Sequence, residues 1–547
     1  MRAVLLVLLL AAALAGCTDR RDDVAVSAAP RPTGDRAYGD TLIRALAANI
    51  SGLIPNIVGD KYSHDAVALV YNGLITHDKD TNIVPDLAES WDLAADCREL
   101  TFRLRKNARW HDGRAFTADD VVFTYQLMSH PKTPSPYKDD FEDVTSVEAL
   151  DPYTVRVRYK SSYANALMIW GQSMLPKHLL ESYMLAGKLK EAPQNFTTPV
   201  GTGPYKFHEI RAGEKIVLVA NPDYYAGRPY ISRIVYRIIP SQATIFLELK
   251  AKGIDQADLT ALQYQRQTDY PAFKSAYNKF RYADKVYNYL GLNHTDRRFA
   301  DKRVRQAFAH AINKRDLIEG VRFGMAREAT GPYKHGTWVY NPNVRTYPYD
   351  PARARKLLAE AGWTTKNAEG LLVKDGQPFT FELLISQGSD EGKKIAEIIQ
   401  SQLRDVGVGV ELRVLEWAAL LKEHIKKHRF AAAAMAWSTG LDPDQYSIWH
   451  SSQTGPDEFN FVSYKNPEVD GLLERGRRTC RQSERKRVYD RLQEIFAEEQ
   501  PLVFLYFRDT MPAVAARVQG IVPGPIGIDY NMYEWYVPKQ LQLYMSE

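Results

Sequence analysis

Two pairs of residues in this chain of 547 residues have side chains that could bind a metal or cleave a bond. His424 and His428 have the spacing of two zinc ligands on a helix, but no glutamate follows the first histidine and two lysines between them would repel a dication. Asp442 and Asp444 are paired acids of the kind that glycosidases use, yet aspartates beside a proline more often cap a helix. We therefore expect a surface helix at the first pair and no catalysis at the second.

Three further motifs imitate functional sites. Asp78–Glu89 spaces its oxygen atoms like a calcium loop, but Ile83 stands where such a loop requires glycine, so we expect a hairpin turn at Asp80–Asn82. His111-Asp112-Gly113 places an acid beside a histidine, but Asp-Gly between apolar runs indicates a turn. Gly201-Thr202-Gly203 is followed by a proline and a strand instead of a helix, which argues against a phosphate site. The sequence predicts no metal, no cofactor and no catalytic residue.

The amino-terminal residues predict export and a lipid anchor. Arg2 precedes the apolar run Val4–Leu14, which has the features of a signal peptide and is too short to span a bilayer. The run ends in Leu14-Ala15-Gly16-Cys17, which resembles the bacterial lipobox. This resemblance implies cleavage after residue 16 and acylation of Cys17, which would tie the mature protein to a membrane. Cleavage near Ala11–Ala13, as in an ordinary signal peptide, is the alternative.

The remaining composition is that of a large soluble globule. The chain is well beyond the ~250–300 residues at which one core usually splits, so two or more lobes are expected. Its net charge of +5, with both signs interspersed, gives no sign of nucleic-acid binding. The most basic stretch, Arg475–Arg487, has helical spacing and is interpreted as a solvated helix face. Cys97 and Cys480 have no partner at metal-ligand spacing, and we expect two free, buried thiols.

Beyond the signal, strands and helices alternate. Residues 18–36 are rich in Ala, Pro, Asp and Arg without periodicity, which is typical of a flexible tether. Asp350-Pro351 and Asn466-Pro467 each predict a helix that begins at the proline, with the preceding polar residue as its cap. The other predicted elements are strands at Thr101–Leu104, Thr154–Tyr159, Ile216–Ala220 and Ile234–Ile239 and helices at Val304–Ile312, Lys393–Leu403 and Arg487–Glu498. This pattern predicts an α/β fold.

Short motifs over nearly the whole mature chain carry a family resemblance. They are Leu87-Ala88-Glu89-Ser90-Trp91, Phe102-Arg103-Leu104-Arg105, Trp110-His111-Asp112-Gly113, Phe116–Val121, Pro199–Tyr205, Asn221–Tyr225, Val304–Ala307, Tyr349-Asp350-Pro351, Gly362-Trp363, Asp442-Pro443-Asp444 and Asn466–Asp470. In kind and order they resemble the motifs of extracellular solute-binding proteins of family 5, the oligopeptide- and dipeptide-binding components of ABC importers.

The resemblance implies an α/β, bilobal fold of the periplasmic-binding-protein kind (type II, cluster C), with an extra inserted subdomain in lobe one. Carried onto this chain, residues 1–16 are the signal peptide and 17–36 the tether. Lobe I comprises 37–67, 198–287 and 513–547, its inserted subdomain comprises 68–197, and lobe II comprises 288–512. The crossovers between lobes fall near Tyr287–Asn293 and Leu505–Pro512, and a ligand that touches both lobes closes them by a hinge.

The same resemblance implies a binding protein and not an enzyme. We expect an exported, monomeric lipoprotein without cofactor, anchored through Cys17 on the periplasmic side in a two-membrane bacterium or at the cell surface in a one-membrane one. Its partners would be a peptide or similar small solute and the permease and ATPase subunits of an ABC importer. A nucleic-acid partner is not expected.

The ligand anchors of dipeptide binders are missing from this chain. In those proteins an acid between a tryptophan and Asp-Pro holds the ligand's ammonium group, and the equivalent position here falls on Thr439 or Gly440. The arginine that grips the ligand's carboxylate aligns with Ser386, and serine cannot replace its charge. We therefore expect a longer or capped peptide, bound through its backbone and apolar side chains. An oligosaccharide or another neutral solute is the alternative.

The side chains expected at family cleft positions are mostly aromatic or carry amides. Asp442 is the only acid near enough in sequence to receive an amine of the ligand. The full set of candidate ligand-binding residues is Trp437, Thr439, Asp442, Tyr446, Trp449, Tyr464, Asn460, Asn56, Tyr71, Asn72, Asn293 and Ser386.

Overall fold

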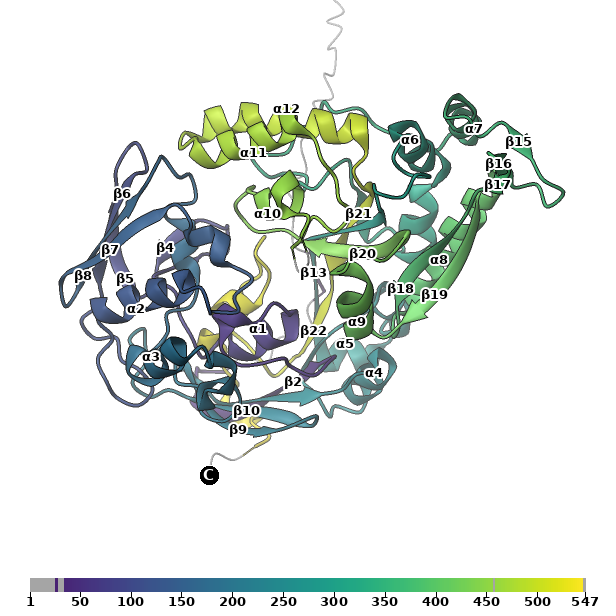
Figure 1. Cartoon of the computed structure of the whole chain (residues 1–547). Coiled ribbons are helices and arrows are strands. Elements are labelled where there is room, and N and C mark those ends of the chain that lie inside the picture. Colours follow the sequence, from purple (N-terminus) through teal and green to yellow (C-terminus); the bar gives the residue numbers. More distant parts are fainter. Residues whose placement is uncertain (1–24, 28–33, 456–457, 545–547) are drawn as a thin grey trace, which may run out of the picture.

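The computed structural model describes residues 25–27, 34–455 and 458–544 (Figure 1). The signal peptide and Cys17 lie outside these ranges, so the lipid anchor stays a prediction. Within them, no helix combines the length and the apolar character that crossing a bilayer requires. Part of the predicted tether is a strand instead of free chain, because β1 (Ala25–Ser27) pairs with Lys279–Arg281, a segment of a long strand that offers its backbone groups as partners.

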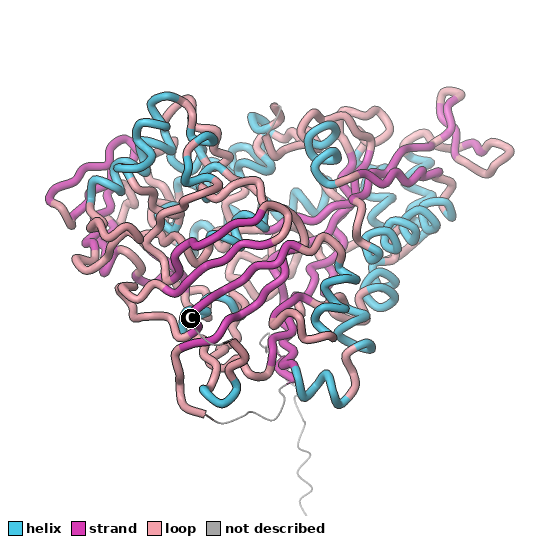
Figure 2. The backbone as a smooth tube through the Cα atoms, turned by 90° about the horizontal axis from the view of Figure 1, so that it is seen from below, coloured by secondary structure: helices cyan, strands magenta, loops and turns pink. Residues whose placement is uncertain are grey.

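A single large sheet runs through both halves of the molecule, and Figure 2 shows several of its strands side by side from below. The strand order is β19-β18-β20-β13-β22-β12-β2-β11-β10-β9, with β1, β14 and β21 paired beside this path. The bounds are β2 Gly39–Leu46, β9 Tyr205–Arg211, β10 Lys215–Ala220, β11 Ile231–Ile238, β12 Gln256–Asp258, β13 Tyr277–Leu292, β14 Ala326–Glu328, β18 Thr380–Ser386, β19 Gly409–Leu415, β20 Ala432–Ser438, β21 Val503–Thr510 and β22 Pro512–Ala515.

The long strand β13 connects the two halves. Its first residues pair with β22, and its later residues pair with β20 on one side and β21 on the other. Buried apolar residues form separate cores on either side of this crossing. One core draws mainly on residues 42–280 and 511–537, and two others draw on residues 287–507. These cores define two lobes. The exact residue boundaries of the lobes remain a prediction from the family resemblance.

A four-stranded antiparallel sheet, β5-β6-β8-β7, lies at the outer end of the first lobe, on the left of Figure 1. Its strands are β5 Ala88–Leu93, β6 Glu99–Leu104, β7 Val144–Asp151 and β8 Thr154–Tyr159, and it is accompanied by α2 Ala118–Ser129 and α3 Lys177–Ala186. Beside it, β3 (Ile75–His77) and β4 (Ile83–Pro85) form the predicted hairpin. Asp78 closes its turn by accepting from the N–H groups of Asp80 and Asn82, both at 2.9 Å.

The predicted helices are confirmed, and two of them have the predicted caps. The Asp350 side chain accepts from Arg353 N at 2.8 Å, and that of Asn466 accepts from Glu468 N at 2.9 Å. The helices of the second lobe are α6 Lys302–Ala311, α7 Pro351–Glu360, α8 Asp390–Asp405, α9 Trp417–Ala419, α10 Tyr446–Trp449, α11 Pro467–Arg478 and α12 Gln482–Glu499. The remaining elements are α1 Lys61–Val67, α4 Gln242–Lys250, α5 Pro271–Ala276 and the small strands β15 Thr365–Lys366, β16 Leu372–Lys374 and β17 Gln377–Pro378.

The prediction of two free thiols is wrong. Cys97, in the loop between β5 and β6, is joined to Cys480, which follows α11, and their Cα atoms lie 6.2 Å apart. That separation is within the range that a disulfide spans. The two residues are 383 positions apart in the chain, and only the meeting of the two lobes brings them together, so their spacing in the sequence carries no sign of the pairing.

Two expectations about surface helices are met only in part. The helical segment that carries His424 ends at a π-helical turn, Leu420–Ile425, and His428 lies beyond it with a left-handed backbone (φ 53°). The two imidazoles therefore do not share a helix face. The basic stretch Arg475–Arg487 spans the junction of α11 and α12, and two of its arginines are buried against carboxylates.

Candidate ligand-binding cleft

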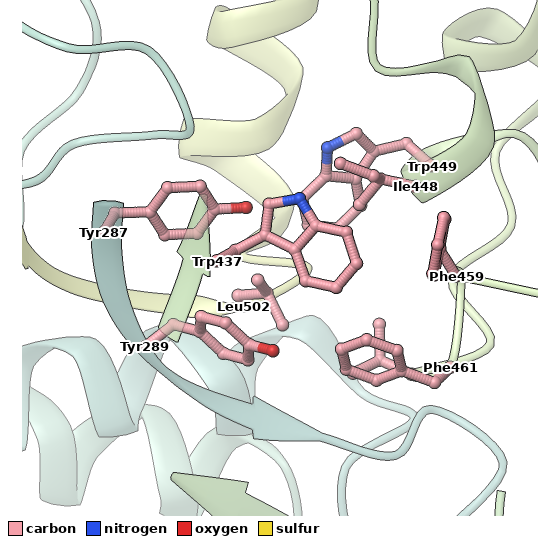
Figure 3. A pocket seen from close by; sticks show the side chains of 9 residues that line it. Tyr287, Tyr289, Trp437, Ile448, Trp449, Phe459, Phe461 and Leu502 are labelled. Carbon is pink, nitrogen blue, oxygen red and sulfur yellow. The ribbon is translucent and has the colours of Figure 1, made fainter. Parts of the chain in front are cut away.

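An aromatic pocket lies in the second lobe, where β13 and β20 run side by side (Figure 3). Tyr287 of β13 stands opposite Trp437 of β20 in the antiparallel ladder, and Tyr289, two residues on, lies on the same face of the strand. Two rings from the loop after α10 (Tyr446–Trp449) complete the wall. The ring centroid of Trp437 lies 5.3 Å from that of Phe459 and 5.8 Å from that of Phe461. The other lining residues are Ile448, Trp449, Val462 and Leu502.

The pocket has two polar groups without partners among the described residues. The hydroxyls of Tyr287 and Tyr289 are buried and make no hydrogen bond, and Figure 3 shows both pointing toward the space beside Trp437. Burial raises the pKa of both phenols, so each stays a neutral O–H donor. Because an unpaired buried hydroxyl costs ~1–3 kcal/mol, a hydrogen-bond acceptor that reached either phenol between the apolar walls would be stabilised there.

Four of the predicted site residues lie in or near this pocket. Trp437 and Trp449 line it. Tyr446 is half-buried, and its ring stacks on that of His450 with centroids 4.1 Å apart. The Thr439 hydroxyl donates to the backbone oxygen of Lys285 at 3.0 Å, so it is held against β13 at the edge of the pocket.

Three other predicted residues of the second lobe are buried and bonded within the fold. The Asn460 amide donates to the Tyr464 backbone oxygen at 2.8 Å, and the Tyr464 hydroxyl donates to Glu499 at 2.6 Å. The Asn293 amide donates to the backbone oxygen of Phe430 at 3.0 Å. These side chains fix the loops behind the aromatic wall. Ser386 ends β18, and its hydroxyl donates to the backbone oxygen of the next residue at 3.2 Å.

The predicted residues of the first lobe form another buried group. The Asn56 amide donates to the Ser173 backbone oxygen at 3.1 Å, and Tyr71 is only 4% exposed. The Asn72 amide donates to both carboxylate oxygens of Asp86 at 3.1 Å. Burial raises the pKa of Asp86 to about 6. These residues belong to the interior of lobe I, and the structure does not bring them together with the aromatic pocket.

Sequence reasoning missed a charged cluster on the first lobe, beside β13. Arg44 pairs with Asp529 at 2.6 Å, and Lys61 pairs with Asp65 one turn further along α1. The side chain of Asp258 touches solvent, but protein atoms surround it on several sides. The partial loss of water around the carboxyl raises its pKa. We infer that these side chains face solvent enclosed between the lobes. They come from distant positions, and each has the sequence context of an ordinary surface charge, so no signal could have found the cluster.

The crossover strand β13 joins the charged cluster to the aromatic pocket. Burial raises the pKa of Tyr282, and the charge of Asp258 adds to the effect. Asp284 follows on the same strand and lies 3.5 Å from Arg508 of β21. Thr439 then contacts Lys285, directly before the ladder that holds Tyr287. The strand β13 therefore runs from the charged cluster in lobe I to the aromatic pocket in lobe II.

The Asp-Pro-Asp segment contacts both lobes but has no free carboxylate. Asp442 accepts two hydrogen bonds from Arg485, at 2.7 and 2.8 Å, and Asp444 accepts one from Arg477 at 2.7 Å. Asn165 of the first lobe reaches across to the same carboxylates: it donates to Asp444 at 3.4 Å or, with its amide turned over, to Asp442 at 2.7 and 2.8 Å. Asp442 is thus paired within the protein and is not available as the predicted amine partner.

The same interface makes stability depend on pH. Burial, and then the charge of Asp444, raises the pKa of Asp140 to about 7, with Arg477 acting in the opposite direction. Asp139 adds a further raising charge, and Gln172 donates to Asp140 at 2.8 Å. An unfolded aspartate titrates near ~3.9, so the folded protein binds the extra proton between the two values. We expect the contribution of this group to the free energy of unfolding to fall as pH rises from about 4 to 7.

Replacing Asp140 by asparagine tests this expectation, because the amide keeps the shape of the side chain without its titration. Denaturant unfolding between pH 5 and 8 should show a weaker decline with pH for D140N than for the unchanged protein. Asp92→Asn is the matched control, because the side chain of Asp92 is 68% exposed, and it should leave the decline unchanged. Equal pH profiles for all three proteins would contradict the assignment.

Two lobes joined by crossover strands, with an aromatic pocket on the crossover strand β13 in the second lobe, have the architecture of a two-lobed ligand-binding protein. The model of the bacterial extracellular solute-binding proteins, family 5, matches residues 82–458. The chain belongs to this family, as the sequence motifs predicted. The family consists of solute-binding proteins and not of enzymes.

Relatives and solved structures agree with this assignment. The chain is 33% identical to the oligopeptide-binding protein AppA of Bacillus subtilis over 489 residues, which are 88% of each chain. The structure of AppA in complex with a nonapeptide has a TM-score of 0.85 at 30% identity and covers 92% of this chain and 100% of that one. NikZ of Campylobacter jejuni, in complex with Ni(L-His), has a TM-score of 0.83 at 31% identity, covering 91% and 99%. The predicted fold class is confirmed.

Proposed function

We propose that this protein is the substrate-binding lipoprotein of an ABC-type importer, which captures oligopeptides or capped peptides between its lobes and delivers them to the permease. It is held at the membrane through Cys17. The observation that carries the proposal is the pairing of an aromatic pocket with unpaired hydroxyl donors at Tyr287 and Tyr289. Such a pocket suits an apolar side chain flanked by peptide carbonyl groups, which accept hydrogen bonds.

The polar groups of the cleft argue against a free dipeptide. Thr439 and Ser386, at the positions of the usual charged anchors, donate to backbone oxygens of the protein itself. An amine of the ligand would meet the exposed carboxylate of Asp258 in lobe I, because Asp442 is paired with Arg485 and Asp529 with Arg44. Tyr282, which the charge of Asp258 influences, and Tyr287 of the pocket are five positions apart on β13, about 16 Å at the rise of a strand, so a ligand that reaches both ends is longer than two residues. The nonapeptide complex of AppA supports this size class.

A second candidate is a receptor of the same fold for an oligosaccharide or another neutral solute. The aromatic walls favour it, because sugars also stack on the faces of tryptophan and tyrosine. The names of the relatives support a range of ligands, since a heme-binding protein A of Haemophilus influenzae is 29% identical over 90% of this chain and 91% of that one.

The test is a thermal-shift screen of the purified chain against peptide pools sorted by length and end-capping, with oligosaccharides as a parallel set. Binding to the folded state raises the melting temperature by mass action. We expect pools of four or more residues to raise it and free dipeptides to leave it unchanged. Mass spectrometry of the material that co-purifies with the protein identifies the natural ligand independently. Shifts with sugars alone would establish the second candidate instead.

Trp437 should dominate the affinity for the ligand found in this screen. Its ring lines the pocket between Tyr287 and Phe459, and truncating a central aromatic residue of an interface costs about tenfold to hundredfold in affinity. Trp417→Ala is the matched control, because Trp417 is 45% exposed and does not line the pocket. Isothermal titration of both variants measures the difference. Equal affinities of W437A and W417A would show that the aromatic pocket is not part of the binding site.

A further inference from the structure

The bond between Cys97 and Cys480 joins one lobe to the other. Cys97 sits in the β5–β6 loop of the four-stranded sheet in lobe I, and Cys480 sits between α11 and α12 of lobe II. Figure 1 shows the end of α11 facing this sheet on the side of the molecule away from β13. A covalent link at this place therefore joins the outer rims of the lobes, opposite the crossover strands that act as the hinge.

The residues around the bond pack as one interface between the lobes. The Ala164 N–H donates to the backbone oxygen of Arg477 at 2.6 Å, one turn before Cys480. Asn165 contacts the Asp-Pro-Asp segment, and the Cys480 sulfur lies 3.4 Å from the backbone oxygen of Asp96. These contacts join the two lobes in the structure, so a hinge movement that parts the lobes at this place would also separate the two sulfurs.

The loop that presents Cys97 is held rigidly. The Cys97 N–H donates to the Ala94 backbone oxygen at 2.8 Å, and the Tyr159 N–H donates to that of Arg98 at 2.9 Å, which ties the loop to the end of β8. Cys97 itself has a left-handed backbone conformation (φ 52°), which L-residues seldom adopt. Cys97 therefore combines an uncommon backbone conformation with a side chain that reaches the other lobe. This combination fits a functional role for Cys97.

We propose that Cys97 and Cys480 form a covalent latch, which closes over a captured ligand and holds the lobes together until thiol–disulfide exchange reopens them. The inference rests on the proposed function, in that a ligand between the lobes brings the sulfurs together. Because the hinge and the latch lie on opposite sides of the cleft, the closed latch prevents the opening that ligand release requires.

The chemistry of the latch is a pair of exchange steps. In closing, the two thiols of the protein reduce an external disulfide to two thiols and are themselves oxidised to one disulfide. In opening, an external thiolate attacks Cys480, because Cys480 is half-buried whereas Cys97 is only 7% exposed. Cys97 leaves as a thiolate, and a second external thiol resolves the mixed disulfide on Cys480. Each opening consumes the two electrons that closing released, so a dithiol reductant of the exported compartment is the implied partner.

The experiment compares the oxidised protein, the reduced protein and the double variant C97S/C480S, each with Cys17 replaced by serine so that only the latch pair is counted. The probe is a fluorescently labelled pool of nonapeptides, loaded before oxidation. We expect no free thiol and at least a hundredfold slower release of the probe in the oxidised protein. The reduced protein and C97S/C480S should release the probe at the same rate as each other.

Two further outcomes separate the latch from the peptide function. Small-angle X-ray scattering needs no ligand, and it should show a smaller radius of gyration for the oxidised protein than for the reduced one. Two free thiols in protein isolated from the exported compartment with alkylation and without reductant would overturn the latch, as would equal release rates before and after reduction. If no peptide binds but oxidation still compacts the protein, the peptide assignment fails and the latch stands.

Discussion

Replacing Arg485 by alanine should lower the free energy of unfolding by ~3–5 kcal/mol, the usual cost of breaking a buried ion pair by removing one partner. The side chain of Arg485 is 7% exposed and that of Asp442 16% exposed. Both terminal nitrogens of Arg485 donate to Asp442, and its Nε donates to the Gly476 backbone oxygen at 3.1 Å. Without the arginine, the mostly buried Asp442 carboxylate loses both of these hydrogen bonds. The junction of α11 and α12 also loses a bond to its backbone.

Urea denaturation measures this effect, and the chain offers a control at the same junction. Arg481 pairs with Glu484 at 3.4 Å, but its side chain is 81% exposed, so Arg481→Ala should change stability by less than ~0.5 kcal/mol. The double variant R485M/D442L removes both charges and should be more stable than R485A, because no uncompensated carboxylate remains. Similar losses in R485A and R481A would show that the buried pair does not carry the stability assigned to it.

Local signals in the sequence predicted the elements and the family well. Asp350-Pro351 and Asn466-Pro467 start helices because the cap and the proline act within one turn, and the structure has both caps. The turn at Asp80–Asn82 follows for the same reason, since Asp78 bonds to backbone groups two and four residues away. Family motifs then supplied the two-lobed arrangement, which no local rule contains. Trp437 and Trp449 are the predicted site residues that line the pocket in the structure.

The features that were missed depend on contacts between distant segments. Arg477 and Arg485 were interpreted as solvated, because their helical spacing does not show that Asp444 and Asp442 approach from another part of the chain. Cys97 and Cys480 meet only because the lobes do. The charged cluster around Asp258 has the same origin. A single sequence predicts which residues share a turn, but partners brought together by lobe packing need coordinates.

Replacing Gly201 by alanine is the second substitution with a large expected effect, about 3 kcal/mol of lost stability. A Cβ atom at this position would overlap the backbone oxygen of Val70 and lie 2.6 Å from its carbonyl carbon, and backbone atoms cannot rotate away as a side chain can. The loop cannot retreat on its other side, because the His111 N–H donates to the Gly201 oxygen at 2.8 Å and the Gly201 N–H donates to His111 Nδ1 at 3.2 Å.

His111 makes this loop rigid as a neutral ring. Burial lowers the pKa of His111 to about 4, so at neutral pH Nδ1 accepts from Gly201 while Nε2 donates to the Gly203 oxygen at 3.0 Å. Gly471→Ala is the control, because its Cβ would meet nothing within 4 Å in the interior of α11, where alanine should add ~0.5–1 kcal/mol. Thermal unfolding of the two variants should therefore shift in opposite directions. An unchanged melting temperature for G201A would mean that the loop moves away from Val70 and that the close contact between these two backbones is not required by the fold.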